Sequence, residues 1–240
     1  MGKVPHTPDE IFEAFVADYR AAFGEQLVAV ILYGSGARGE YVPKRSDINF
    51  LIVLAEDGMR ELAKALPLVG KWRKRNVSTP LFMTPEYITS SLDSFPMEFL
   101  ALQRHHRVVY GQDPLAALDT DQRLLRLQCE RELKGKLLHL REGYLATEGR
   151  ARPLTALIRR SLATFVPLFE ALLALRGVEV PAGKKEVIAK TAQTFGLDGG
   201  LFAELWRVLV GEKRNAQVLN RLTQQYIWEV RKLALIVDKL

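Results

Sequence analysis

The chain has 240 residues, of which 48% are hydrophobic and 26% charged, and its formal net charge is +6. This composition is typical of a soluble globular protein and excludes a disordered chain. No apolar run approaches the roughly 20 residues of a membrane-spanning helix, so we expect no membrane association and no signal peptide. The single cysteine, Cys129, excludes an internal disulfide and favours a reducing cytoplasm. The positive charge favours polyanionic partners, either a nucleoside triphosphate or nucleic acid.

The first predicted element is a helix over residues 8–23. Thr7 lies in the N-cap position, Pro8 suits the first helical position, and Glu10 completes a Thr-x-x-Glu capping box. The elements that follow are predicted as strands at 28–33 and 49–54, a helix at 56–68, a strand at 79–83, a helix that Thr84 caps, a helix at 96–104 and a strand at 107–110. Strands interleaved with helices indicate a small α+β domain with a mixed sheet.

From residue 119 onward the pattern is entirely helical. Apolar side chains recur at spacings of three and four, in stripes that begin at Leu125, Leu154 and Leu219, with a shorter helical stretch at 201–210. Such stripes are the seams of an antiparallel helical bundle. We therefore predict a domain at residues 1–118 and an all-α bundle domain at residues 119–240.

Two polar motifs follow the first two predicted strands. Gly34-Ser35 turns the chain after the first strand, and a helix is expected to begin at 36–40, where backbone amides would attract an anion. Asp47 and Asn49 open the second strand and point the same way, because side chains alternate along a strand. The turn could cradle a phosphate, and Asp47 could hold a divalent metal on it.

Together these motifs resemble the nucleotidyltransferase superfamily (the DNA polymerase β-like fold), whose signature is a Gly-Ser turn, a Gly-containing helix and Ser-Asp-x-Asp. The residues that match this signature are Gly34, Ser35, Arg38, Gly39, Ser46 and Asp47. With its helical C-terminal half, the chain looks like kanamycin-type nucleotidyltransferases and the small bacterial MNT proteins. The resemblance implies that Gly34, Ser35, Arg38 and Ser46 bind a nucleoside triphosphate. It also implies that Asp47 is catalytic and that Asp47 and Asn49 occupy the Mg²⁺ position.

The chain departs from that signature at its acidic positions. Asn49 is an amide where the family has a second carboxylate, and two-metal phosphoryl transfer needs concentrated negative charge. The third predicted strand, 79–83, carries no acid at all. Glu86 suits the first turn of a helix, and Glu98 is expected on an amphipathic helix. The sequence therefore predicts a pseudoenzyme that binds nucleotide, with weakened Mg²⁺ binding and weak or lost catalysis.

Two alternatives stay open for this fold. The first is an active Mg²⁺-dependent enzyme that moves a nucleoside monophosphate from the triphosphate to a hydroxyl of a small molecule or protein. The second concerns partners: the likeness to MNT proteins implies a HEPN-like helical protein, or self-association of this chain. Either alternative would use the same turn and the same Asp47.

The remaining candidates favour structural roles. Lys71–Arg75 combines basic residues with Trp72 and could hold nucleic acid, but a solvated loop with Trp72 tucked beneath it is the preferred interpretation. His105 and His106 are adjacent and point in different directions, which argues against a zinc site. Arg159 and Arg160 lie opposite an apolar stripe, as is usual on the solvent face of a helix.

Overall fold

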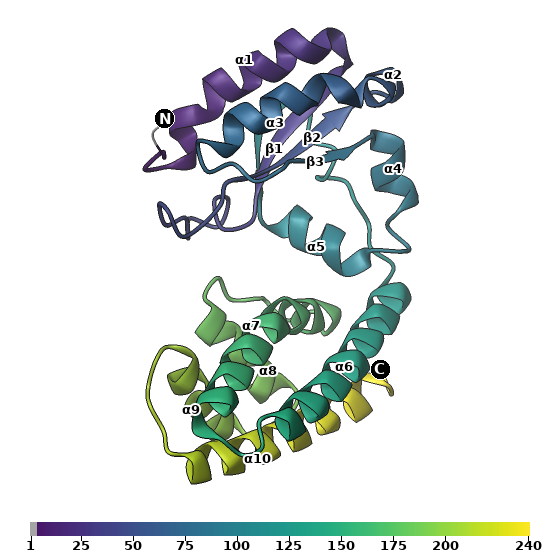
Figure 1. Ribbon diagram of the computed structural model, residues 1–240. Coiled ribbons are helices and arrows are strands. Elements are labelled where there is room, and N and C mark those ends of the chain that lie inside the picture. The colour runs from purple at the N-terminus through teal and green to yellow at the C-terminus, as the bar shows by residue number, and fades with distance from the viewer. Residues whose placement is uncertain (1–3) are drawn as a thin grey trace. The chain divides into compact units, whose positions relative to one another are not determined.

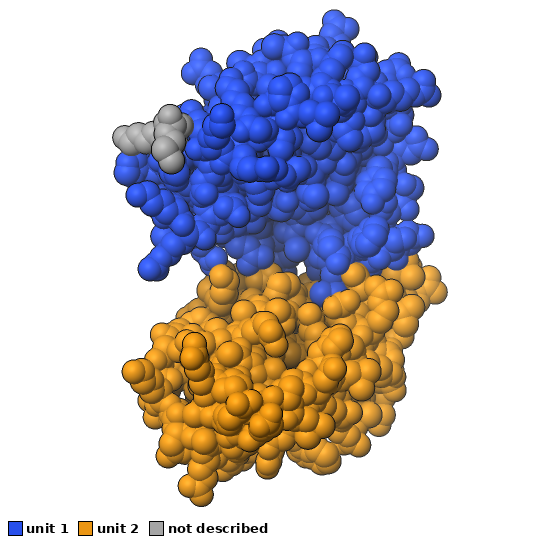
Figure 2. Space-filling model, viewed as in Figure 1, with its two compact units in different colours: residues 1–120 blue, residues 121–240 orange. Residues whose placement is uncertain are grey.

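The structure, a computed structural model, describes residues 4–240 (Figure 1). The chain divides into two compact units, residues 1–120 and residues 121–240 (Figure 2). The first unit is α+β with one mixed sheet, and the second is built of helices, as the sequence predicted. The domain boundary expected after residue 118 stays a prediction, because compactness alone does not define which parts fold independently.

The sheet of the first unit has four strands in the order β3-β2-β1-β4. The strands are β1 (Leu27–Tyr33), β2 (Asn49–Leu54), β3 (Leu81–Met83) and β4 (His106–Gly111). β1 runs antiparallel to β2 and β4, whereas β2 and β3 are parallel. The third strand is shorter than the predicted 79–83, and Pro80 just before it has no backbone N–H to donate to a ladder.

Alternate side chains of the central strands divide the core of this unit between two faces of the sheet. Even-numbered residues such as Leu32 and Phe50 pack with α1 (Phe12–Phe23) and α3 (Leu66–Arg73). Odd-numbered residues pack with α4 (Pro85–Ser90) and α5 (Pro96–Arg104). Asn49 and Tyr33 are odd-numbered, so the period of two places them on the α4–α5 face.

Two predicted helices of this unit are interrupted. The helix at 8–23 begins as a 3₁₀ turn, Pro8–Ile11, in which the Glu10 carboxylate accepts hydrogen bonds from the backbone of His6 and Thr7. The single helix expected at 56–68 is instead α2 (Glu56–Arg60), a 3₁₀ turn (Leu62–Ala65) and α3. Pro67 explains the restart, because proline suits the first turn of a helix and not its interior.

The second unit consists of α6 (Gln122–Ala146), α7 (Ala151–Leu175), α8 (Lys184–Thr194), α9 (Gly199–Leu209) and α10 (Ala216–Val237). The predicted stripes are buried, apart from Tyr144 and Leu240 at their ends. The sequence analysis missed α8, a short polar helix that buries Val187, Ile188 and Thr191. Among residues 4–240, no helix has the length and apolarity to span a membrane.

Candidate functional site

The Gly34-Ser35 turn leaves the sheet at the end of β1. Gly34 adopts a φ of +70°, in the left-handed region that glycine enters without a steric penalty. The turn is closed by hydrogen bonds from the Arg38 amide to the Gly34 carbonyl (3.1 Å) and from the Glu40 amide to the Ser35 carbonyl (2.9 Å). Residues 34–39 are turns, so the helix expected to begin at 36–40 is wrong. Any phosphate contact here depends on individual amides and not on a helix dipole.

Ser46 and Asp47 lie in the loop that enters β2. The Ser46 hydroxyl accepts a hydrogen bond from the Val42 amide (3.2 Å), and the Ser46 carbonyl accepts one from Asn76 Nδ2 (2.6 Å). These two hydrogen bonds of Ser46 stabilise the conformation of the loop. Asp47 is exposed, and within the described part of the chain its carboxylate makes no hydrogen bond or ion pair. That carboxylate is available to a cation.

Asn49 is the first residue of β2 and pairs with Tyr33 of β1. Its Oδ1 accepts a hydrogen bond from the Ser78 hydroxyl (2.8 Å), and its Nδ2 donates to the Asp47 carbonyl (3.3 Å). The same Nδ2 lies against the turn, since a Cβ atom at Gly34 would be only 3.1 Å away from it. The structure therefore brings the Gly34 turn, Asp47 and Asn49 together. Both ends of the Asn49 amide are already engaged.

A depression of about 280 Å³ lies beside this turn. It is lined by Tyr33, Gly34, Arg38, Leu81, Glu98, Ala101, Leu102 and His105. Burial raises the pKa of the Tyr33 hydroxyl above its ordinary value, so this wall of the depression is uncharged. Sequence reasoning missed the contribution of Glu98 and His105. The available signal for Glu98 was its spacing of four from Leu102 on the predicted helix at 96–104, and His105 follows directly after that helix.

The donor set can be tested for Mg²⁺, which prefers carboxylate and phosphate oxygens. Asp47 supplies one carboxylate, but the Asn49 oxygen is neutral and already accepts from Ser78. Over residues 4–240, no group of three or more His, Cys, Asp or Glu side chains is arranged to hold a metal ion. The site fits a single Mg²⁺ that takes most of its ligands from phosphate and water. It does not fit a two-metal centre.

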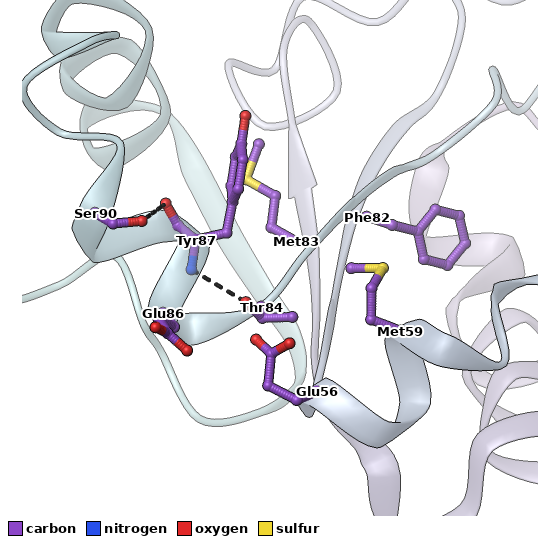
Figure 3. Close-up of a pocket in the computed structure, with 8 residues that line it drawn as sticks. All are labelled: Glu56, Met59, Phe82, Met83, Thr84, Glu86, Tyr87 and Ser90. Carbon is purple, nitrogen blue, oxygen red and sulfur yellow. Dashed lines mark hydrogen bonds between the residues drawn. The ribbon is translucent and has the colours of Figure 1, made fainter.

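A larger cavity, about 540 Å³, lies at the opposite end of β2 (Figure 3). Its lining residues are Glu56, Met59, Phe82, Met83, Thr84, Glu86, Tyr87 and Ser90. Thr84 caps α4, as predicted, by accepting a hydrogen bond from the Tyr87 amide (3.1 Å). Strands rise roughly 3.3 Å per residue, so the two ends of the six-residue β2 are about 16 Å apart. Glu86 accordingly does not join Asp47 in one site.

The basic run Lys71–Arg75 is built around a buried indole. Trp72 is 2% exposed, its Nε1 donates to Asp18 Oδ2 (2.9 Å), and its ring packs edge-on against Phe15 (5.1 Å between ring centres). A buried ring cannot stack on a nucleic acid base. Trp72 is thus tucked away as expected, although it lies in the last turn of α3 and not in a loop.

Comparison with known proteins assigns no family to the chain: no protein-family model and no curated protein sequence matches it. Among solved structures, it is similar to a spectinomycin adenyltransferase from Enterococcus faecialis, determined with ATP and spectinomycin. The match covers 94% of this chain and 99% of that chain, at 15% identity and a TM-score of 0.49. At these values the similarity assigns no activity to this chain.

Proposed function

We propose that this chain is a nucleotidyltransferase-like protein that binds a nucleoside triphosphate at the Gly34-Ser35 turn and has weak or lost catalytic activity. One observation carries the proposal. The position of the family's bridging carboxylate is held by Asn49, whose amide is bonded to Ser78 at one end and to the Asp47 carbonyl at the other.

The amide matters because two-metal transfer requires an anionic bridge between the ions. Asn49 offers no negative charge, and its Nδ2–H group carries a partial positive charge that would repel a cation. No acid lies on β3 to compensate. Phosphate binding needs none of these acids, since it uses the Ser35 hydroxyl, backbone amides of the turn and the Arg38 guanidinium.

Within this proposal the Asp47 carboxylate would supply the protein ligand to a Mg²⁺ bound to the triphosphate, and the ion would neutralise phosphate charge. A protein that binds nucleotide without catalysis would act through binding, so the proposal includes a protein partner. That partner is a HEPN-like helical protein or a second copy of this chain. Nucleic acid has less support, because the ring of Trp72 is buried.

Calorimetry with ATP, CTP, GTP and UTP, each with Mg²⁺, tests the nucleotide site. We expect at least one of them to bind, and we expect Asp47→Ala to weaken the Mg²⁺-dependent affinity by about tenfold, the scale of one lost charged contact. Asn49→Asp should tighten binding of the Mg²⁺ complex, because it adds a carboxylate beside Asp47. Absence of heat with all four nucleotides would contradict the site, and an unchanged affinity in Asn49→Asp would contradict the metal position.

A second candidate function, active nucleotidyl transfer, has one specific observation in its favour. Glu98 lines the same depression as Gly34 and Arg38. Its carboxylate would accept the proton of an acceptor hydroxyl as that oxygen bonds to the α-phosphorus and pyrophosphate leaves. Pyrophosphate release that disappears in both Asp47→Ala and Glu98→Gln would establish this function. Release that survives Asp47→Ala would exclude it.

A further inference from the structure

The second unit contains a basic cavity of about 470 Å³, remote in sequence from the Gly34 turn. It lies between the first turns of α7 and the segment that joins α9 to α10. Its lining residues are Ala151, Arg152, Thr155, Ala156, Arg159, Glu212, Lys213 and Arg214. Every one of these residues belongs to the second unit, so the cavity is complete within it.

The α7 side of the cavity has long basic walls and a floor of small side chains. Arg152 and Arg159 are seven residues apart, which is about two helical turns or roughly 10 Å along one face. Ala151, Thr155 and Ala156 lie between or beside them. The Thr155 hydroxyl is turned to the Ala151 carbonyl (2.9 Å). The small side chains between Arg152 and Arg159 leave room for a ligand that both guanidinium groups can contact.

The carboxylates near the cavity are already neutralised. Arg214 pairs with Glu204 (3.0 Å) and with Glu212 (2.6 Å), and Arg207 pairs with Glu204 as well. The two arginines together balance the two carboxylates and leave no excess charge. Three cations remain: Arg152, Arg159 and Lys213. Throughout residues 4–240, no carboxylate forms an ion pair with any of these three.

One of these cations is also fixed in position. Arg159 Nε donates to the Val208 carbonyl in the last turn of α9 (2.9 Å), which leaves its remaining N–H groups for a ligand. The amino-terminal end of α7, a helix of 25 residues, adds its positive dipole to the same region. Three uncompensated cations around one hollow repel one another, and a bound anion would relieve that repulsion.

We propose that this cavity binds the phosphate group of a small phosphorylated molecule. A dianionic phosphate matches several converging cations, and guanidinium groups hold its oxygens by paired hydrogen bonds. The volume is that of a small-molecule site, whereas nucleic acid would need an extended basic surface. The site is independent of the triphosphate site proposed for the first unit.

The test is calorimetric titration of the full chain with inorganic phosphate and with glucose 6-phosphate, in the absence of nucleotide and Mg²⁺. We expect one binding site per chain, and we expect the double variant Arg152→Gln/Lys213→Gln to lose at least about tenfold in affinity. Both residues are exposed, so these variants should fold as the parent does.

A control variant locates the binding. Arg160→Gln removes the neighbouring charge on α7 without touching the lining, and it should not change phosphate affinity. Three outcomes would overturn the proposal. They are an affinity that the double variant leaves unchanged, an equal loss in Arg160→Gln, and tight binding of a single-stranded RNA by a chain that binds neither phosphate probe.

Discussion

Asn49 links the loop that enters β2 to Ser78, which lies just before β3. As an amide it donates to the Asp47 carbonyl and accepts from Ser78. A carboxylate at this position would place an oxygen about where Nδ2 now lies, 3.3 Å from the Asp47 carbonyl oxygen, and the two oxygens would repel without a cation between them. The amide therefore stabilises the loop without a cation, which favours the proposed nucleotide binding without two-metal chemistry.

At the same residue scale, the turn can be tested through a matched pair of glycines. Gly34 and Gly39 have nearly equal φ values, +70° and +73°, but only at Gly34 would a Cβ atom meet a neighbour, Asn49 Nδ2 at 3.1 Å. We expect both alanine variants to lose about 1 kcal/mol from left-handed strain. Gly34→Ala should lose measurably more and also weaken nucleotide binding.

Urea denaturation of the two variants makes the comparison. The difference between them isolates the contact of the turn with Asn49, because the backbone strain is common to both. Equal free energies of unfolding would mean that the turn does not press against Asn49 as described.

At the scale of elements, α1 and α3 are joined by a polar contact beneath the basic run. The Trp72 indole donates to Asp18 on α1, and Lys71 forms an ion pair with the same carboxylate. The contact ties the last turn of α3 to α1. Lys71 and Trp72 of the basic run therefore have a structural role that does not involve nucleic acid.

Removal of the Asp18 carboxylate should lower the free energy of unfolding. Asp18→Ala would leave the indole N–H of a buried tryptophan without its partner, and we expect a loss of about 1–3 kcal/mol in the free energy of unfolding. Asp57→Ala is the control, since Asp57 forms only an exposed pair with Arg60 and should change stability by less than about 0.5 kcal/mol. Thermal unfolding followed by tryptophan fluorescence compares them, and equal stabilities would show that the contact is not made.

Element by element, the sequence predicted long periodic segments better than short ones. The apolar stripes of α6, α7 and α10 span several turns, so their helical period is unambiguous. α8 is short and mostly polar, and it depends on packing against α7 that the sequence does not display. Pro67 marks the start of α3, because proline suits the first turn of a helix and not its interior.

The sequence likewise predicted the site residues that lie close together in the chain better than those that come from distant segments. Gly34, Ser35, Asp47 and Asn49 lie close in sequence, and their meeting follows from two antiparallel strands. Ser78 and Glu98 come from segments more than 25 residues further on. The position of Ser78 in the site depends on the parallel β2–β3 pairing, and that of Glu98 depends on the face of the sheet that α5 covers. Periodicity alone determines neither.

At the scale of the whole molecule, each compact unit contains its own apolar core. The first core lies on both faces of the sheet, and the second lies between the helices of residues 121–240. A unit with a closed core of its own is expected to fold alone. This arrangement makes the two proposed anion sites separable by experiment.

We therefore expect residues 1–120 and residues 121–240, produced separately, each to unfold cooperatively on heating, as followed by circular dichroism. The first should retain nucleotide binding, and the second should retain phosphate binding. A fragment that is folded only when mixed with the other would show that the two units share one folding unit.

The hydrogen-bonded amide of Asn49 also bears on how this chain could change over evolutionary time. Asparagine and aspartate codons differ in a single base, so one mutation would exchange the amide for a carboxylate. The exchange would make the loop depend on a cation for its shape, yet β3 would still lack an acid. A lineage could thus gain affinity for metal in one genetic step, while two-metal chemistry would require at least one more.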